Sequence, residues 1–150
     1  MSTRSAEHGT FVITRTYPAS PERVFAAWSS RDAKARWFGA PGEANDALRQ
    51  DFRVGGTETN RGGPPDGPVF TYEATYQDIV PDERIVYSYT MDMNGTVTSV
   101  SVTTVEFAAA SAGTTLTMTE QGVFLDGADT VTVREKGTGE LLDQLAAALG

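Results

Sequence analysis

The hydrophobic pattern starts as that of a strand and then changes to that of a helix. Residues 10–17 are mostly β-branched or aromatic, and alternate positions share one face, which predicts a β-strand. Ser20 and Pro21 are typical of the N-cap and the first position of a helix, and the apolar residues after them recur at helical spacing. The pattern therefore predicts a strand followed by a short helix over residues 21–29.

The stretch RWFGAPG predicts where a second short helix ends. Ser30 or Asp32 can cap this helix. We expect it to end at Trp37 and Phe38, because Gly39 favours the left-handed conformation that follows many helices. The proline and glycine after it predict a turn.

Most of the remaining chain alternates as strands do. Aromatic and β-branched residues with turn residues between them predict strands over residues 69–80, 84–91, 96–107 and 114–121, and weaker alternation over 45–61 predicts two short strands. Leucines at helical spacing predict a C-terminal helix that begins between Asp129 and Glu140 and runs to the end. The expected fold class is therefore α+β, with about seven antiparallel strands and a long final helix that covers one face of the sheet.

Composition fits one globular domain of 150 residues. We expect residues 1–9, which are polar, to form a flexible tail. They contain no apolar segment of the kind that directs export, so a cytoplasmic location is expected. We leave open whether the protein is a monomer or a homodimer.

The absence of some residue types narrows the chemistry. The chain has no cysteine, and its only histidine is His8, so nucleophilic triads are excluded and no metal or other cofactor is expected. The net charge is −8, which repels phosphate groups. We therefore expect neither nucleic acid nor a membrane surface as a partner. The basic residues Arg31, Lys34 and Arg36 are interpreted as a solvated helix face.

Several short motifs occur in order along the chain. They are RTYPASPERVF (15–25), RWFG (36–39), DFRVGG (51–56), IVPDERIVY (79–87) and GTTL (113–116). Together they resemble the START/Bet v 1-like superfamily, and within it the bacterial proteins named after the activator of Hsp90 ATPase. The resemblance implies a helix-grip fold: an antiparallel sheet of about seven strands grips the C-terminal helix around an internal cavity, with two short helices after the first strand.

One position departs from that family. Relatives often carry Gly-Trp on the last helix, whereas this chain has Gly137-Thr138. A large side chain that would point into the cavity is therefore missing. We expect a roomier cavity than in such relatives.

The resemblance suggests which residues line the cavity. Trp37 and Phe38 are expected to form a wall or lid at its mouth, although either ring can instead simply fill the core. Aromatic and apolar residues on the inward faces of the strands are the other candidates, with core packing as the alternative for each. These ligand-binding candidates are Tyr72, Tyr87, Tyr89, Phe107 and Met118.

Two charged residues are the weaker, catalytic candidates. Arg15 and Glu120 point inward if the strand alternation holds. Buried charges need partners, so these two either pair with each other or serve a ligand. A strand end or bulge that turns them to solvent is the alternative.

Three functions stay open, and they belong to different classes. The first is a binding protein for a small hydrophobic molecule. The second is an enzyme, because some superfamily members are polyketide cyclases or aromatases, although without a histidine in the cavity the acid or base would have to be Glu120, Arg15 or a tyrosine. The third is a co-chaperone-like interaction domain, as the family name suggests.

Overall fold

A computed structural model describes residues 4–39 and 45–150 of the chain. Its elements are β1 (Ala6–Tyr17), α1 (Pro21–Ser29), α2 (Arg31–Lys34), β2 (Arg49–Gln50), β3 (Thr57–Gly62), β4 (Phe70–Val80), β5 (Arg84–Met93), β6 (Thr96–Ala110), β7 (Gly113–Leu125) and α3 (Val131–Leu149). This order of elements confirms the order that the sequence predicts.

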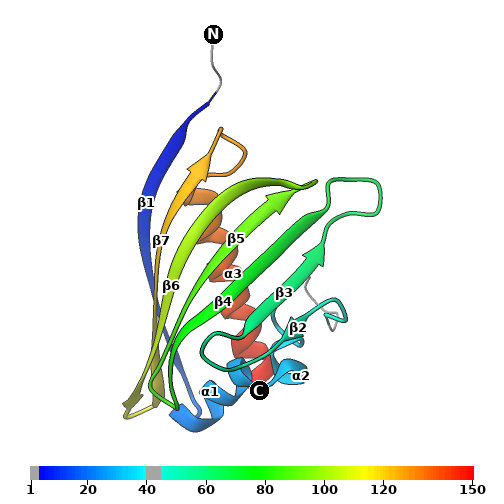
Figure 1. The fold of residues 1–150 in the computed structure, drawn as a ribbon. Helices are drawn as coiled ribbons and strands as arrows, with labels where there is room; N and C mark the ends of the chain where they lie inside the picture. The colour runs from blue at the N-terminus through cyan, green and yellow to red at the C-terminus, as the bar shows by residue number, and fades with distance from the viewer. Residues whose placement is uncertain (1–3, 40–44) are drawn as a thin grey trace.

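The strands form one antiparallel sheet in the order β1-β7-β6-β5-β4-β3-β2. The first strand pairs with the last, and the chain then passes through α1 and α2 to reach the opposite edge. The sheet curves around α3, and α1 and α2 lie at the end of the sheet where the C-terminus lies (Figure 1). This arrangement is the α+β helix-grip fold, which confirms the predicted fold class.

The two short helices begin as predicted. The Ser20 hydroxyl accepts a hydrogen bond from the backbone of Arg23, and Ser30 does the same for Ala33 at the start of α2. The second helix ends earlier than predicted, at Lys34, so that turns carry the chain to Gly39, which has a φ of 146°. The rest of the predicted turn, residues 40–42, lies outside the described residues.

The first strand is longer than the pattern predicts. It begins at Ala6, and Gly9 pairs with Gly122 in β7. The prediction of a flexible tail is therefore wrong for residues 6–9, because a partner strand satisfies the backbone of polar residues as well as that of apolar ones. Residues 1–3 of the predicted tail lie outside the described residues.

The last helix starts at Val131, within the predicted interval. Thr130 caps it by accepting a hydrogen bond from the backbone of Val133. Gly137 and Gly139 both lie inside the helix. Farther along, the Tyr17 hydroxyl donates to the carbonyl of Leu142 over 2.9 Å and ties β1 to α3.

The core differs between the two ends of the space under α3. Beside α1, apolar side chains such as Phe25, Val105 and Phe107 fill the space. Toward the start of α3, the buried residues of β6 become polar, as at Ser99 and Thr103. Buried polar residues need partners. This end of the sheet is therefore the candidate for a polar site.

Candidate functional site

A cavity of about 330 Å³ lies between α3 and the sheet. Aromatic and apolar side chains make most of its wall, and three charged residues lie toward the start of α3. The lining residues are Phe38, Tyr72, Tyr87, Tyr89, Met91, Met118, Glu120, Asp129, Val133, Arg134, Gly137, Thr138 and Leu141. The wall is thus mainly apolar with a small charged region, which is the usual composition of a small-molecule site.

Aromatic rings form a continuous part of this wall. Tyr72 of β4 and Tyr89 of β5 have ring centroids 5.0 Å apart, and Phe38 lies 5.2 Å from Tyr72. Tyr87 precedes Tyr89 on the same face of β5, at 6.0 Å. Burial raises the pKa of all three tyrosines well above the ordinary value, so that their hydroxyls stay protonated and can donate hydrogen bonds.

Glu120 of β7 is the buried carboxylate of the cavity, with a side chain only 2% exposed. Its Oε2 atom accepts a hydrogen bond of 2.9 Å from the Tyr89 hydroxyl, and its Oε1 atom accepts one of 3.0 Å from Thr103. Burial raises the pKa of Glu120, although the Tyr89 hydrogen bond and the nearby charge of Arg134 act in the opposite direction. A carboxyl group with a raised pKa can hold or release a proton closer to neutral pH.

Arg134 reaches across the cavity from the first turn of α3. Its guanidinium donates to Asp129 over 2.7 Å, to the Tyr89 hydroxyl over 2.7 Å and to Ser99 over 2.8 Å. The distance from its Nη1 atom to Oε2 of Glu120 is 3.7 Å. Arg134 therefore links the start of α3 to β5 and β6, and its charge is shared between two carboxylates.

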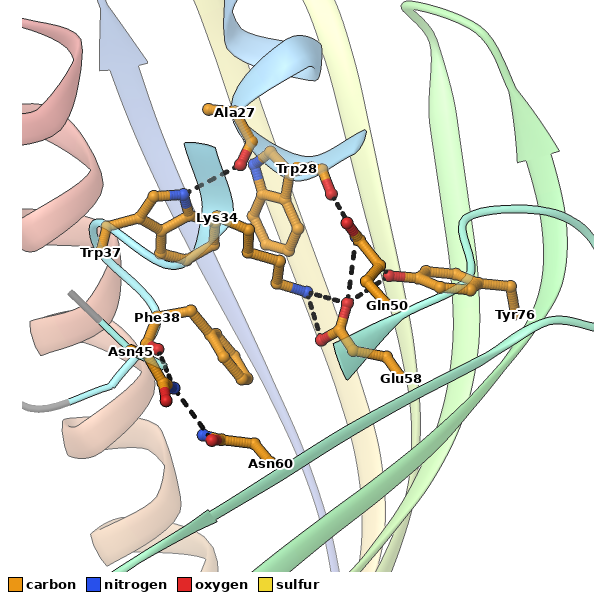
Figure 2. Close-up of polar contacts among 10 residues, drawn as sticks. All are labelled: Ala27, Trp28, Lys34, Trp37, Phe38, Asn45, Gln50, Glu58, Asn60 and Tyr76. Carbon is orange, nitrogen blue, oxygen red and sulfur yellow. Dashed lines mark hydrogen bonds and ion pairs between the residues drawn. The ribbon is translucent and has the colours of Figure 1, made fainter. Parts of the chain in front are cut away.

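A second buried carboxylate lies under α2 (Figure 2). Glu58 of β3 contacts the Lys34 ammonium at 2.7 and 3.0 Å, and it also accepts hydrogen bonds from Tyr76 and Gln50. The Lys34 ammonium lies 4.5 Å from the ring centroid of Phe38. Lys34 is 1% exposed, so the prediction of a solvated face is wrong at this residue, because its side chain faces the sheet and pairs with Glu58 of β3.

The structure brings together most of the predicted site residues. One charged and five uncharged candidates line the cavity: Phe38, Tyr72, Tyr87, Tyr89, Met118 and Glu120. The other candidates, Trp37, Phe107 and Arg15, are not among its lining residues.

Trp37 and Phe107 belong to the packed core. The Trp37 indole donates to the carbonyl of Ala27 over 3.0 Å, and its ring packs on that of Trp28. Phe107 packs edge-to-face on Phe25, with ring centroids 5.4 Å apart. For these two candidates the alternative interpretation, core packing, describes the structure.

Arg15 and Glu120 do not pair with each other. Arg15 lies on the edge strand β1, so its side chain passes the flank of α3 and reaches Asp143 at 3.4 Å, half-exposed. Glu120 lies one strand farther in, where Arg134 reaches it. For Arg15 the alternative of a side chain that turns to solvent therefore describes the structure, because the sheet edge leaves room for it to turn aside.

Sequence reasoning missed Arg134 and Asp129. Their positions flank the start of α3, which the pattern left undefined between Asp129 and Glu140. The carboxyl side chain five residues before Arg134, next to a capping Thr130, is the signal that would have placed the helix start and turned Arg134 toward the sheet.

Open space lies beside Gly137. A Cβ atom there would meet no atom of another element within 4 Å in the part of the chain that the structure describes. Gly137 and Thr138, the pair that departs from the family pattern, both line the cavity. Whether the cavity is larger than those of relatives stays a prediction.

A smaller cavity of about 290 Å³ adjoins the first. The two share Met91, Asp129, Val133 and Arg134 in their walls, and the smaller one extends to Phe70 at the start of β4. Val133 and Phe70 are 63% and 40% exposed. An exposed apolar residue, Val133, and the Arg134 side chain thus border both cavities.

Two other kinds of feature, a membrane-spanning helix and a metal site, are not found in the described part of the chain. Among residues 4–39 and 45–150, no helix is long and apolar enough to cross a membrane. The same residues contain no cluster of three or more acidic or histidine side chains arranged to hold a metal ion.

Comparisons with known proteins identify relatives over almost the whole chain. The sequence model of the family described as "Activator of Hsp90 ATPase homolog 1-like protein" matches residues 18–150. An uncharacterized protein from Rhizobium leguminosarum is 47% identical, with 97% of each chain covered and a TM-score of 0.93. The Mll3558 protein from Rhizobium loti is also 47% identical, with 96% of this chain and 99% of that chain covered and a TM-score of 0.88. A protein from Chromobacterium violaceum is 29% identical over 93% of this chain and 96% of that chain, with a TM-score of 0.81. A search of the curated proteins finds no match.

Proposed function

The chain belongs to the family of activator of Hsp90 ATPase homolog 1-like proteins, and we propose that it binds a small, mainly apolar molecule in the cavity beside Glu120. The observation that carries the proposal is the cavity itself, with about 330 Å³ of space behind an aromatic and aliphatic wall. Ligand sites typically measure about 300–1,000 Å³. The shared fold supports the proposal, since it commonly binds hydrophobic ligands.

The lining suggests how such a molecule lies. Its apolar body packs against Tyr72, Met118 and Leu141, where each Å² of apolar surface removed from water contributes about 25 cal/mol. Its polar group points toward Glu120 and Arg134, because polar groups in an enclosed site need partners. A molecule of roughly ten to fifteen non-hydrogen atoms, such as a substituted naphthalene, suits a cavity near the lower end of this volume range.

Native mass spectrometry tests the proposal first. The protein is purified from its own host, and its mass under gentle ionisation is compared with its mass after denaturation. A small molecule released on denaturation supports the proposal and gives the class of the ligand.

The second test uses a substitution that fills the cavity and measures the affinity for naphthylethanol as the probe. In Gly137→Phe the new ring enters the open space beside the helix, so we expect the affinity for the probe to fall by at least about tenfold. The matched control is Gly139→Ala, whose new methyl group meets the end of the Arg15 side chain rather than the cavity. Equal probe affinity in wild type and Gly137→Phe, with both folded by circular dichroism, contradicts the proposal.

One observation favours a second candidate, an enzyme that moves protons. A buried carboxyl group with a raised pKa beside a tyrosine and an arginine is the arrangement that acid–base chemistry on a bound ketone requires. Under this candidate, Glu120 removes a proton from the carbon next to the carbonyl, and Tyr89 or Arg134 stabilises the oxygen.

Deuterium exchange distinguishes the enzyme from the binding protein. Naphthylacetone is incubated in heavy water, and exchange of its methylene protons is followed by NMR. Accelerated exchange that is lost in Glu120→Gln, with binding retained, supports the enzyme. Binding without accelerated exchange leaves the binding function alone.

A further inference from the structure

The charges around the cavity do not balance. Among the described residues that line it, two carry carboxyl groups, Glu120 and Asp129, and one carries a positive charge, Arg134. Arg134 lies closer to Asp129, at 2.7 Å, than to Glu120, at 3.7 Å. Glu120 therefore has only part of one positive charge as its counter-ion, while its closest partners, Tyr89 and Thr103, are neutral hydroxyls.

The cluster of Glu58 and Lys34 is a buried carboxylate with a balancing charge in the same protein. Lys34 contacts both oxygens of Glu58, and the two side chains are 1% and 0% exposed. Each negative charge there has a positive charge of its own. Glu120 differs because it lies on the wall of a cavity, where a ligand can supply what the chain does not.

Aromatic rings line the cavity wall next to Glu120, where the Tyr89 hydroxyl donates a hydrogen bond to its carboxylate. The rings of Phe38, Tyr72, Tyr87 and Tyr89 follow one another along the wall. The faces of such rings attract cations, most strongly where water is excluded; in this protein the Lys34 ammonium lies over the ring of Phe38 and the Arg134 guanidinium over that of Tyr89. The tyrosine hydroxyls remain neutral, so they add no charge that would change this balance.

We propose that the cavity selects an organic cation: a protonated amine on an apolar body, with its ammonium group against Glu120 and its body against the aromatic wall. The proposal deepens the binding function above and rests on it. The amine brings the site to two negative and two positive charges. A carboxylate ligand would instead add a third negative charge around the single guanidinium of Arg134.

Binding of the amine is also linked to release of a proton from Glu120. The titratable groups that face Glu120 are Tyr87 and Tyr89 from β5, Arg134 from α3 and Asp129 from the loop before it. The two tyrosines stay neutral. Burial lowers the pKa of Arg134, but Tyr89, Asp129 and Glu120 together outweigh burial, so that the pKa is raised. Since an ammonium group favours the ionised form of Glu120, amine binding releases the proton from any Glu120 that still carries one.

Three matched probes test the proposal: naphthylethylamine, naphthylethanol and naphthylacetic acid. Their apolar bodies are alike and their polar groups differ in charge. By isothermal titration calorimetry near neutral pH, we expect the amine to bind about tenfold more tightly than the alcohol and the acid to bind most weakly. An alcohol or acid that binds as tightly as the amine overturns the proposal.

A calorimetric titration of the wild type in two buffers with different ionisation enthalpies tests the proton linkage. At pH about 5, a little above the ordinary pKa of a glutamate, we expect the amine to release protons on binding and the alcohol to release none. Proton uptake on amine binding at this pH overturns the proposal, because the ammonium favours the ionised form of Glu120. This measurement needs no variant, so it holds even if changes at Glu120 disturb folding.

The variant Glu120→Gln keeps the shape of the side chain and removes its charge. We expect the preference for the amine over the alcohol to fall from about tenfold to about onefold, with Glu140→Gln, an exposed residue of the same helix as Arg134, as the control. An unchanged preference in Glu120→Gln overturns the proposal.

The probes also separate this proposal from the binding function. If the alcohol binds, and binding is lost in Gly137→Phe, the binding function stands whatever the amine does. If none of the three probes binds, both proposals fail.

Discussion

The two buried carboxylates among the described residues, Glu58 and Glu120, have almost the same exposure and opposite surroundings. Glu58 has its own lysine, held at 2.7 Å under a cover of aromatic rings. Glu120 has two neutral hydroxyls and a share of one arginine, and it borders a cavity. The comparison teaches that burial of a carboxylate alone does not indicate a functional site. We propose Glu120 rather than Glu58 as the site because its charge is unbalanced and it borders open space.

The Lys34–Glu58 pair and the Arg134–Glu120 pair also contribute differently to the stability of the fold. Lys34 belongs to α2, a helix of four residues, which is too short to be stable by itself. Its contact with Glu58 fixes α2 over the sheet. Arg134 is one turn into a helix of 19 residues that has apolar contacts of its own, so the fold depends less on Glu120.

The largest expected effect comes from removing one charge of the balanced pair. Glu58→Gln leaves the Lys34 ammonium buried without a counter-ion, and we expect a loss of about 3–5 kcal/mol in the free energy of unfolding. Glu120→Gln leaves no cation stranded, since Arg134 keeps Asp129, and we expect a change of about 1 kcal/mol or less. Urea unfolding at neutral pH measures both.

A double variant serves as the control for this pair. Lys34→Met with Glu58→Leu removes both charges and fills similar volume, so we expect it to regain most of the stability that Glu58→Gln loses. Equal losses in Glu58→Gln and Glu120→Gln would break the comparison of the two carboxylates.

The next effect comes from removing the arginine that Glu120 shares. Arg134→Gln loses hydrogen bonds to Asp129, Tyr89 and Ser99, and we expect a loss of about 1–3 kcal/mol in the free energy of unfolding. It also removes the positive charge that lowers the pKa of Glu120, so that pKa rises further. Urea unfolding and an NMR titration of the glutamate carboxyl signals measure the two effects.

Arg15→Gln is the matched control, because Arg15 makes its ion pair at the surface with Asp143. We expect it to change stability by about 1 kcal/mol or less and to leave the titration of Glu120 unchanged. A pKa of Glu120 that does not rise in Arg134→Gln would show that the arginine does not act on this carboxyl group.

A pH series sharpens the comparison further. The pKa of Glu120 is raised above the ordinary 4.5, so the folded protein holds this proton more tightly than the unfolded chain does. Its stabilising contribution is fully present below that ordinary value and is lost as pH rises through the folded pKa. We therefore expect Glu120→Gln to gain stability relative to wild type as pH rises through this window, measured by urea unfolding at each pH. A constant difference across the window would contradict the raised pKa.

The smallest expected effect is on the free energy of unfolding when helical glycines beside the cavity are replaced. Gly137→Ala and Gly139→Ala each replace a helical glycine, and each should raise the free energy of unfolding by about 0.5–1 kcal/mol. The new methyl group at Gly137 meets open space, whereas that at Gly139 meets the end of the Arg15 side chain at 3.4 Å. We therefore expect the larger gain at Gly137, measured by thermal unfolding. A loss of stability in Gly137→Ala would mean that the cavity closes around the glycine.

Local patterns predicted most of the elements of the fold. Ser20-Pro21 placed the start of α1, and alternation placed β4 and β5, because capping and strand burial depend on residues close in sequence. Alternation also placed Tyr72, Tyr89 and Glu120 on the inward face of the sheet. The same rule failed for Arg15, since a sheet edge lets a side chain of the inward face turn to solvent.

The sequence by itself determined the order of strands and helices and the inward row of tyrosines, and it named Glu120 as one of two charged candidates. Only the tertiary structure decided the partners of the charges. Lys34 finds Glu58 24 residues away, and Tyr89 receives Arg134 from 45 residues away. Such pairs depend on how α2 and α3 lie across the sheet. The spacing of hydrophobic residues shows which face of a helix or strand is buried. It carries no information about which buried charges pair with each other.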